Sequence, residues 1–529
     1  MEAQYPYQDA GLSVHQRVED LLSRMPLADK VGLMFHTIAV PADVDAVVPL
    51  FGERSLRSLV DKGLRHFNVL GSLPDGRSFA QWHNSVQSAA LRHPLGIPVT
   101  FSSDPRHHFG DNPLTQMMAG PFSLWPEPLG LAAIGSADRV REFADIVRQE
   151  YLAVGIRVAL HPQLDVATEP RWSRINTTFG EDAELTSRLG VAYVDGLQGA
   201  RLGADSVAAM VKHFPGGGPQ LDGNDPHFGW GREQVYPGDN AAYHLRPFRA
   251  ALDAGAAEVM PYYGMPVGTD WDEVGFGFNK SVITGLLRDE LGFDGIVCTD
   301  WGLVSDHPDL GDLGVARAWG VEHLGPADRA LRVIEAGADQ FGGEDCTEVL
   351  LGLVRDGRVS ESRIDESVRR LLRVTFTLGL FEHPFVDEES ASITLGRIDF
   401  REAGLAAQRD SLTLLTNTGL LPLARGAKVF APQISAAALE GHATRVDDPA
   451  AADVAVLRIK APYEPRSEGM AALFHHGSLE FAAEEVRRIL EVCAAVRTVI
   501  DVYLDRPAVL TPLAGAAAAL IANFGVSER

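Results

Sequence analysis

The sequence predicts an α/β fold in which a (β/α)8, TIM-like barrel is followed by a smaller α/β sandwich domain. The chain has 529 residues, more than one hydrophobic core usually serves, so two domains are expected. Short apolar runs alternate with amphipathic stretches from residue 30 to about 345. This alternation indicates parallel strands joined by crossover helices, and it resumes near residue 400.

Eight apolar runs are candidate strands of the barrel. They are 31–38, 67–70, 97–101, 156–160, 207–211, 257–260, 296–298 and 338–341. Amphipathic stretches that predict helices lie between most of them, for example at 79–91, 138–151, 183–197, 240–254 and 282–291. Eight strand–helix repeats favour a barrel. A doubly wound open sheet is the main alternative, because strand runs alone do not report closure.

A second unit follows the barrel. After a predicted helix at 361–378, Pro384 and the acidic residues at 387–389 mark a linker. We therefore predict a barrel over 12–385, a linker over 386–400 and an α/β sandwich domain over 401–529. Its candidate strands are 428–431, 454–459 and 498–503, with a helix at 484–495 and a last apolar run at 516–524. Because this length is short for a covered parallel sheet, we expect the domain to be incomplete at its C-terminal end.

Composition narrows the classes of partner. The net charge of −24 argues against nucleic acid or an anionic membrane as the main partner. The cysteines, Cys298, Cys346 and Cys493, form neither a disulfide framework nor a CxxC zinc pair. The N-terminus lacks the apolar core of a signal peptide, and no apolar run approaches the ~18 residues of a membrane span. We expect a cytoplasmic protein without a metal or another cofactor; its oligomeric state stays open.

Polar side chains follow six of the predicted strands at their carboxyl ends. They include Asp104, Asp165, Lys212 with His213, Tyr262 with Tyr263, Asp300 with Trp301, and Glu344. Active sites of barrels form at this face, so these residues predict a site there. Carboxylates accept hydrogen bonds from hydroxyls, Lys and Arg donate them, and aromatic rings stack on sugar C–H surfaces. The predicted ligand is therefore neutral and rich in hydroxyl groups.

Four short motifs along the chain carry a family resemblance. They are Glu169-Pro170-Arg171-Trp172-Ser173-Arg174, Phe179-Gly180-Glu181-Asp182, Lys212-His213-Phe214 and Thr299-Asp300-Trp301. Their order resembles the signature of glycoside hydrolase family 3, over nearly the whole chain from about residue 12. That family contains β-glucosidases, β-xylosidases and N-acetylglucosaminidases. The resemblance implies a retaining, exo-acting hydrolase that releases a terminal β-linked sugar, with a β-glucoside as first choice and a β-xyloside or mixed specificity next.

The resemblance also implies roles for individual residues. Asp300 matches the catalytic nucleophile and Trp301 an aromatic wall beside it. The residues that match sugar-binding groups of the family are Asp104, Arg174, Lys212, His213, Tyr263 and Asp225. Arg171 is expected to be structural. The ligand implied is a small-molecule or oligosaccharide β-glycoside.

A retaining glycosidase needs a second carboxyl about 5–5.5 Å from the nucleophile, to act as acid and base. The resemblance implies that this group comes from the second domain, and Glu464 is the favoured candidate. Glu468, between Ser467 and Gly469, is its rival. Gly217 stands where N-acetylglucosaminidases of the family carry a proton-transferring His, so a glucosidase-like activity is favoured.

Three other functions remain open at this point. A glycoside phosphorylase on the same scaffold would need a cationic pocket for phosphate. A non-catalytic sugar-binding protein is an alternative from another class, because the second domain is expected to be incomplete. An aldolase-like barrel would use Lys212 as a Schiff-base amine, although the number of carboxylates is high for that chemistry.

Overall fold

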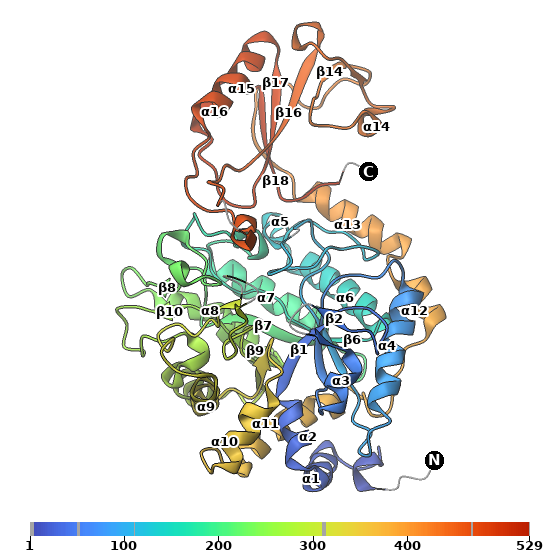
Figure 1. Cartoon of the computed structure of the whole chain (residues 1–529). Helices are drawn as coiled ribbons and strands as arrows, with labels where there is room; N and C mark the ends of the chain where they lie inside the picture. The colour runs from blue at the N-terminus through green and yellow to red at the C-terminus, as the bar shows by residue number, and fades with distance from the viewer. Residues whose placement is uncertain are drawn as a thin grey trace.

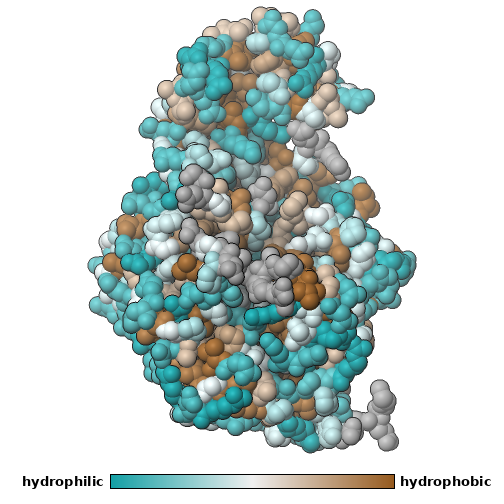
Figure 2. Space-filling model, viewed as in Figure 1, coloured by the Kyte–Doolittle hydropathy of each residue, from teal (hydrophilic) through white to brown (hydrophobic). Residues whose placement is uncertain are grey.

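The computed structural model describes residues 5–49, 53–110, 112–308, 311, 314–466 and 469–527. A large barrel domain carries a smaller sheet domain on one of its faces (Figure 1). In the space-filling view the molecule narrows towards the smaller domain (Figure 2). Among the described residues, no helix combines the length and the apolar character needed to span a membrane.

The barrel is an eight-stranded sheet whose paired strands all run parallel, in the order β11-β9-β7-β6-β5-β4-β1-β12. An isolated parallel bridge between Cys298 and Gln340 joins the last strand to the first, so the sheet closes. This confirms the barrel rather than the open sheet. The strands are β1 (Phe35–Ala39), β4 (His66–Val69), β5 (Thr100–Ser103), β6 (Ile156–Ala159), β7 (Ala208–Phe214), β9 (Glu258–Pro261), β11 (Ile296–Val297) and β12 (Phe341–Gly342).

Helices surround the barrel and cover the outer faces of its strands (Figure 1). They are α1 (Val14–Arg24), α2 (Leu27–Leu33), α3 (Leu56–Asp61), α4 (Gly76–Ala90), α5 (Pro128–Ile134), α6 (Ala137–Ala153), α7 (Ala183–Gln198), α8 (Ala241–Asp253), η6 (Ser281–Glu290), α9 (Pro326–Ala336), α10 (Thr347–Arg355) and α11 (Glu361–Thr377). Several begin at the side-chain caps that their sequences suggest. Asp75, Ser136 and Asp182 each accept a backbone N–H bond from the third residue that follows.

The predicted strand at 31–38 is wrong in its first half. Residues up to Leu33 form helix α2, and the strand begins only at Phe35. Lys30 on this helix forms ion pairs of 2.8 Å with Glu361 and Asp365 of α11, which fix the helix against its neighbour. A short apolar run does not distinguish a buried helix from a buried strand, and here the helix is favoured by packing on α11.

The second domain is a six-stranded mixed sheet in the order β13-β18-β17-β16-β14-β15. Its strands are β13 (Thr413–Asn417), β14 (Lys428–Phe430), β15 (Thr444–Arg445), β16 (Val454–Lys460), β17 (Thr498–Tyr503) and β18 (Ala519–Asn523). Helix α15 (Ala483–Ala495) packs beside β16. The neighbours Val499 and Ile500 belong to two separate apolar clusters, one on each face of the sheet. The predicted α/β sandwich is confirmed, and the sequence missed β13 and β15.

The segment predicted as a linker, 386–400, is largely helical. Helix α12 (Glu388–Thr394) contacts α4 and α6 of the barrel, and α13 (Ile398–Asp410) follows it and contacts α5. The α4–α12 contact is close, since a Cβ on Gly76 would lie 2.1 Å from the carbonyl oxygen of Ala391. This part of the chain therefore covers the barrel.

Glu127 joins the barrel to the second domain. Its backbone N–H donates to the carbonyl oxygen of Phe524 at 2.8 Å, and its Oε1 accepts bonds from the Phe109 N–H at 3.1 Å and the Tyr503 hydroxyl at 3.5 Å. The side chain is fully buried. Burial raises the pKa of Glu127 to about 8, and the nearby Asp505 carboxylate adds to the rise. The carboxyl is therefore protonated at neutral pH.

This carboxyl predicts a pH-dependent loss of stability. The folded state holds the Glu127 proton more tightly than the unfolded state does. Proton binding at Glu127 therefore makes its full contribution to the free energy of unfolding below pH 4.5, and this contribution is lost as pH rises through about 8. Glu127→Gln keeps the shape of the protonated acid and removes the titration. We expect its advantage in free energy of unfolding over the unmodified protein to grow by up to about 1.4 kcal/mol per pH unit in that window. Denaturant unfolding between pH 5 and 9 measures it.

The matched control is Glu480→Gln, which changes an exposed glutamate. Its stability relative to the unmodified protein should stay constant across the same pH range. A Glu127→Gln advantage that is constant or falls with pH would contradict the prediction.

Candidate active site

A cavity of about 340 Å³ lies at the carboxyl ends of the barrel strands, on the side that faces the second domain. Seven of the ten predicted site residues line it: Asp104, Arg174, Lys212, His213, Tyr263, Asp300 and Trp301. They come from four different strand ends and from the loop after β6. The closed barrel therefore brings together residues that lie up to 197 positions apart, between 104 and 301.

Asp300 follows strand β11 and is 8 % exposed. Its Oδ1 accepts a bond from the Trp301 N–H at 2.8 Å, which holds the carboxylate in place. Its Oδ2 has no hydrogen-bond partner among the described residues and lies 3.9 Å from His213 Nε2. The Tyr263 hydroxyl fixes the same backbone, because it donates to the Trp301 carbonyl at 2.9 Å. One oxygen is thus anchored and the other is unengaged.

Lys212 and Asp104 form an ion pair in the same cavity. Lys212 Nζ lies 2.7 Å from Asp104 Oδ1, and Asn68 Nδ2 donates to Asp104 Oδ2 at 2.8 Å. Asn68 Oδ1 also accepts from the Asp104 N–H at 3.0 Å, so Asn68 holds both the side chain and the backbone of Asp104. Asn68 was not predicted as a site residue. A paired ammonium and carboxylate can donate to and accept from neighbouring hydroxyls of one sugar ring.

His213 is buried and electrically neutral. Burial lowers its pKa well below the usual range, and the neighbouring Arg174 guanidinium lowers it further. Its Nδ1–H donates to Asp165 Oδ2 at 2.7 Å, and its Nε2 accepts from Arg174 Nη1 at 3.2 Å. Arg174 also donates to Gln163 at 3.2 Å. These bonds hold His213 in one tautomer and aim the guanidinium at the cavity.

Asp165 supports this arrangement from behind the cavity. It accepts bonds from the His213 side chain and from the backbone N–H groups of His213 and Gly217. Burial raises its pKa to about 6, so the group is a carboxylate above that pH. The sequence placed it at a strand end but assigned it no role.

Asp225 lies outside the cavity lining. It accepts bonds from His227 Nδ1 at 2.6 Å and from Trp172 Nε1 at 3.3 Å, and it is buried. His227, which it orients, does line the cavity. The structure therefore places Asp225 behind the wall, and direct contact with a sugar is not expected. Arg171 also lies outside, at the surface, where it pairs with Glu169 at 2.7 Å.

The two candidates for the acid lie in the second domain. Glu464 is exposed and does not line the cavity; its Oε1 accepts from the Ser478 N–H at 3.1 Å. Glu468 lies outside the described residues. The flanking residues are docked on the barrel. Arg466 lies 3.5 Å above the Trp230 ring and donates to Asn224 at 2.9 Å, and Met470, in the short helix η9 (Gly469–Leu473), lines the cavity.

Comparisons with known proteins agree with this arrangement. Residues 63–374 match the family described as "Glycosyl hydrolase family 3 N terminal domain". The chain is 48% identical over 527 residues to β-glucosidase C of Emericella nidulans, covering 98% of this chain and 85% of that protein. The chain belongs to glycoside hydrolase family 3.

Two further relatives extend this picture. The chain is 40% identical over 554 residues to the periplasmic β-glucosidase/β-xylosidase of Dickeya chrysanthemi, covering 99% of this chain and 84% of that protein. The crystal structure of β-glucosidase from Listeria innocua in complex with glucose superposes with a TM-score of 0.76 at 25% identity, covering 96% of this chain and 72% of that one.

Within the family, Gly217 distinguishes this chain from the N-acetylglucosaminidase pattern. A Cβ on Gly217 would lie 2.6 Å from the ring of Tyr262 and 3.1 Å from Asp165 Oδ1. The glycine lets its backbone approach Asp165 and donate a hydrogen bond to it. A histidine has no room there, so no proton donor is available at this position.

Gly342 and Gly343 pack closely against the Trp301 ring. A Cβ on Gly343 would lie 2.6 Å from Trp301 Cδ1, and one on Gly342 would lie 2.7 Å from Trp301 Cε3. The centroid of the His36 ring lies 5.3 Å from that of the Trp301 ring. The indole of this family 3 protein therefore packs on β1 and on the end of β12.

The close packing of Gly343 on the indole predicts that Gly343→Ala lowers activity by displacing the ring. We expect kcat/KM on an aryl β-glucoside to fall about tenfold or more, because small misplacements of site groups are costly. The control is Gly357→Ala: its φ of 71° is close to the 69° of Gly343, but its Cβ would meet nothing within 4 Å. Both variants should lose about 1–2 kcal/mol of stability from backbone strain. Equal activity of the two variants would contradict the prediction.

Two further features complete the site. Among the described residues, no group of three or more His, Cys, Asp or Glu is arranged to hold a metal ion. A second cavity, of about 550 Å³, lies between the domains and shares Arg174 with the first. The carboxyl ends of β16, β17 and β18 contribute to it Lys460, Tyr503 and Asn523.

Proposed function

We propose that this protein is a retaining, exo-acting β-glucosidase that forms a covalent glycosyl-enzyme on Asp300. The proposal depends on Asp300 Oδ2. This oxygen has no hydrogen-bond partner among the described residues and lies in a cavity that also holds the Lys212–Asp104 pair. The identities of 48% and 40% to proteins named β-glucosidase C and β-glucosidase/β-xylosidase support glucose as the sugar. A β-xyloside or mixed specificity is the alternative that the second name favours.

The polar side chains suit a single pyranose ring. Asp104 accepts bonds from two sugar hydroxyls, while Lys212 and Arg174 donate to others. Trp301 and Tyr263 provide apolar ring surface for the C–H face of the sugar. The cavity volume of about 340 Å³ limits the number of rings that enter, which supports release from the chain end.

In the first step an Asp300 oxygen attacks the anomeric carbon, and the bond from that carbon to the leaving oxygen breaks. The acid transfers its proton to the leaving oxygen, so a neutral alcohol departs. In the second step the acid/base residue, now a carboxylate, removes a proton from water. The water oxygen attacks the anomeric carbon, and the bond from that carbon to Asp300 breaks. Arg174 supplies positive charge near the nucleophile, and neutral His213, whose Nε2 lies 3.9 Å from Asp300 Oδ2, holds the guanidinium in place by accepting a hydrogen bond from it.

We propose Glu468 as the acid and base, in place of the favoured Glu464. Glu468 stands two residues before Met470, which lines the cavity, and two residues span at most about 7 Å. Arg466 on the other side is docked on Trp230 and Asn224. By contrast, the carboxylate of Glu464 accepts from Ser478 outside the cavity.

The other functions have less support. Lys212 Nζ is bound to Asp104, which leaves no unengaged amine for a Schiff base. Phosphorolysis would require phosphate beside the nucleophile, and hydrolysis that is independent of phosphate would exclude it. A sugar-binding protein without turnover would bind glucose and leave every glucoside intact.

A panel of nitrophenyl glycosides tests the proposal. The β-glucoside should be hydrolysed with the highest kcat/KM, the β-xyloside should follow, and phosphate should change neither. Proton NMR should show β-glucose as the first product, because two displacements retain configuration. Faster hydrolysis of the N-acetylglucosaminide, or α-glucose as first product, would overturn the proposal.

A further inference from the structure

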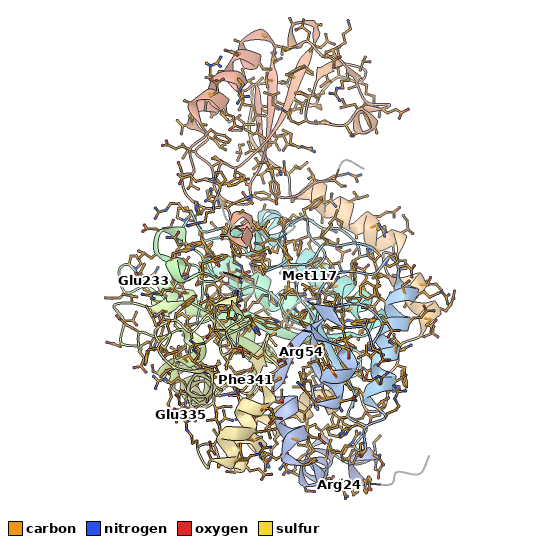
Figure 3. The ribbon with its side chains drawn as sticks, viewed as in Figure 1. Arg24, Arg54, Met117, Glu233, Glu335 and Phe341 are labelled. Atoms are coloured by element: carbon orange, nitrogen blue, oxygen red, sulfur yellow. The ribbon has the colours of Figure 1, made fainter. Side chains whose placement is uncertain are left out.

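One wall of the cavity is apolar. Leu114 and Met117 come from the loop between β5 and α5, and Met470 comes from helix η9 of the second domain. We call these three residues the apolar wall. The residues proposed to bind the sugar come instead from the strand ends and, for Arg174, from the loop after β6. Met117 lies between the barrel strands and the second domain (Figure 3). The polar groups of the cavity therefore lie mainly at the strand ends, and the lining where the two domains meet is apolar.

The apolar wall is a fixed part of the structure. Met117 is 4% exposed and its N–H donates to the carbonyl oxygen of Pro105 at 2.8 Å. Leu114 packs against Phe228, Ala471 and Phe474, a cluster that spans both domains. The side chain of Asn112 adds a hydrogen bond between the two segments, because it donates to the Leu473 carbonyl at 3.4 Å. The loop and helix η9 are thus held together beside the cavity.

The leaving group must lie against this wall. The proton donor is proposed to come from the second domain, so the leaving oxygen faces that domain. Among the described residues of the second domain, Met470 is the one that lines the cavity. Ser305 and Arg317 also line the cavity, but the Arg317 guanidinium lies 6.0 Å from the Tyr263 ring, next to the nucleophile. The group bonded to the leaving oxygen therefore passes between Leu114 and Met470.

We infer that the leaving-group site formed by Leu114, Met117 and Met470 takes an aromatic or alkyl aglycone rather than a second sugar. This inference rests on the proposed glucosidase function. The three side chains offer no strong hydrogen-bonding group, so sugar hydroxyls buried against them would lose their bonds to water without replacement. Thioethers adapt to irregular apolar shapes and make favourable contacts with aromatic rings. The substrate class is thus β-glucosides of apolar alcohols and phenols.

A series of n-alkyl β-glucosides tests the inference on the unmodified protein. The unbranched alcohols from ethanol to octanol are leaving groups of nearly equal acidity, so chain length isolates contact with the aglycone. Each methylene that becomes buried should raise kcat/KM by about two- to fourfold. We expect a gain of at least about tenfold from ethyl to hexyl. Hexyl glucoside should also exceed cellobiose, whose second sugar is polar.

Substitution of the wall should flatten this series. Met470→Gln and Leu114→Asn keep the approximate size of the side chain and add polar groups; each should lower the hexyl-to-ethyl ratio of kcat/KM at least about threefold. Met118→Gln is the matched control, because Met118 is 70% exposed and does not line the cavity. Its ratio should stay unchanged.

The outcomes separate the two proposals. A flat alkyl series, or a preference for cellobiose, overturns the apolar aglycone while glucoside hydrolysis itself leaves the proposed function intact. Unchanged ratios in both wall variants overturn the assignment of Leu114 and Met470. Absence of hydrolysis of every glucoside, with the protein folded, overturns the proposed function and this inference with it.

Discussion

Replacing Asp300 with glycine is expected to lower kcat on an aryl β-glucoside by about 10⁴-fold or more, which corresponds to roughly 5.5 kcal/mol of transition-state stabilisation. The reason is geometric. Asp300 Oδ2 is the unengaged carboxylate oxygen in the cavity lining, and no other described group there can replace it as a nucleophile from the same position. Asp104, the other carboxylate of the lining among the described residues, is bound to Lys212 and Asn68.

Azide should restore part of the lost activity in Asp300→Gly. The small anion fits the space left by the carboxylate, attacks the anomeric carbon and yields a glycosyl azide of inverted configuration, which mass spectrometry and NMR detect. Lys212→Met is the matched control. It removes a bond to the sugar but keeps the nucleophile, so it should lose activity without any response to azide. Near-normal activity of Asp300→Gly would rule out the assigned nucleophile.

The barrel was predictable from sequence because its strands are buried on both faces. Such strands appear as continuous apolar runs, and all eight runs correspond to observed strands, with shifts of a few residues. Strand β13 was missed for the opposite reason. It lies at an edge and pairs antiparallel with β18, and four of its five residues are exposed, so it carries no core pattern.

The linker was predicted from signals that serve another purpose. The acidic residues at 387–389 cap and begin helix α12, where Asp387 accepts from the Ser390 N–H at 2.7 Å. Sequence alone does not tell a capping carboxylate from a solvated linker charge. The buried Ala391 and Leu395, which face the barrel, are too few to form a visible pattern.

The site residues also divide into those that the sequence predicted and those that it missed. The predicted residues that line the cavity stand directly at strand ends or in a family motif, where their position in the chain reports their position in space. Asn68 and Asp165 position Asp104 and His213, and His227 is itself held by Asp225; tertiary contacts of this kind leave no spacing signal. Asn68 carries a weak one, since it is a polar residue inside an apolar run.

The choice between Glu464 and Glu468 as the acid shows most clearly what the sequence alone could not decide. They stand four residues apart in the sequence between β16 and α15, without the periodicity that would assign either to a face. The structure adds the Ser478 bond that holds Glu464 outside the cavity and the position of Met470 within it. These contacts support the proposal of Glu468 over Glu464 as the acid.

Glu468→Ala is expected to lower kcat/KM on ethyl β-glucoside by about 10³-fold, within the usual range for loss of a general acid. A 2,4-dinitrophenyl glucoside should lose much less in the first step, because its phenolate departs without a proton. Its glycosyl-enzyme should then accumulate, since the same residue serves as base for water. A burst of dinitrophenol followed by slow turnover, measured by stopped-flow absorbance, would report both roles.

Glu464→Ala is the matched control, with the same chemical change four positions away. Because its carboxylate accepts from Ser478 at the surface, we expect both substrates to react within about twofold of the unmodified protein and no burst to appear. Exogenous azide or formate should speed turnover of Glu468→Ala on the dinitrophenyl substrate by attacking the glycosyl-enzyme, and should leave Glu464→Ala unaffected. If the burst and the rescue instead follow Glu464→Ala, the loop must rearrange when the sugar binds, and the carboxylate must exchange its Ser478 bond for the leaving oxygen. Because that exchange breaks a backbone contact at residue 478, removing it in advance by Ser478→Pro would then raise the rate, whereas with Glu468 as the acid the same substitution should leave the rate unchanged.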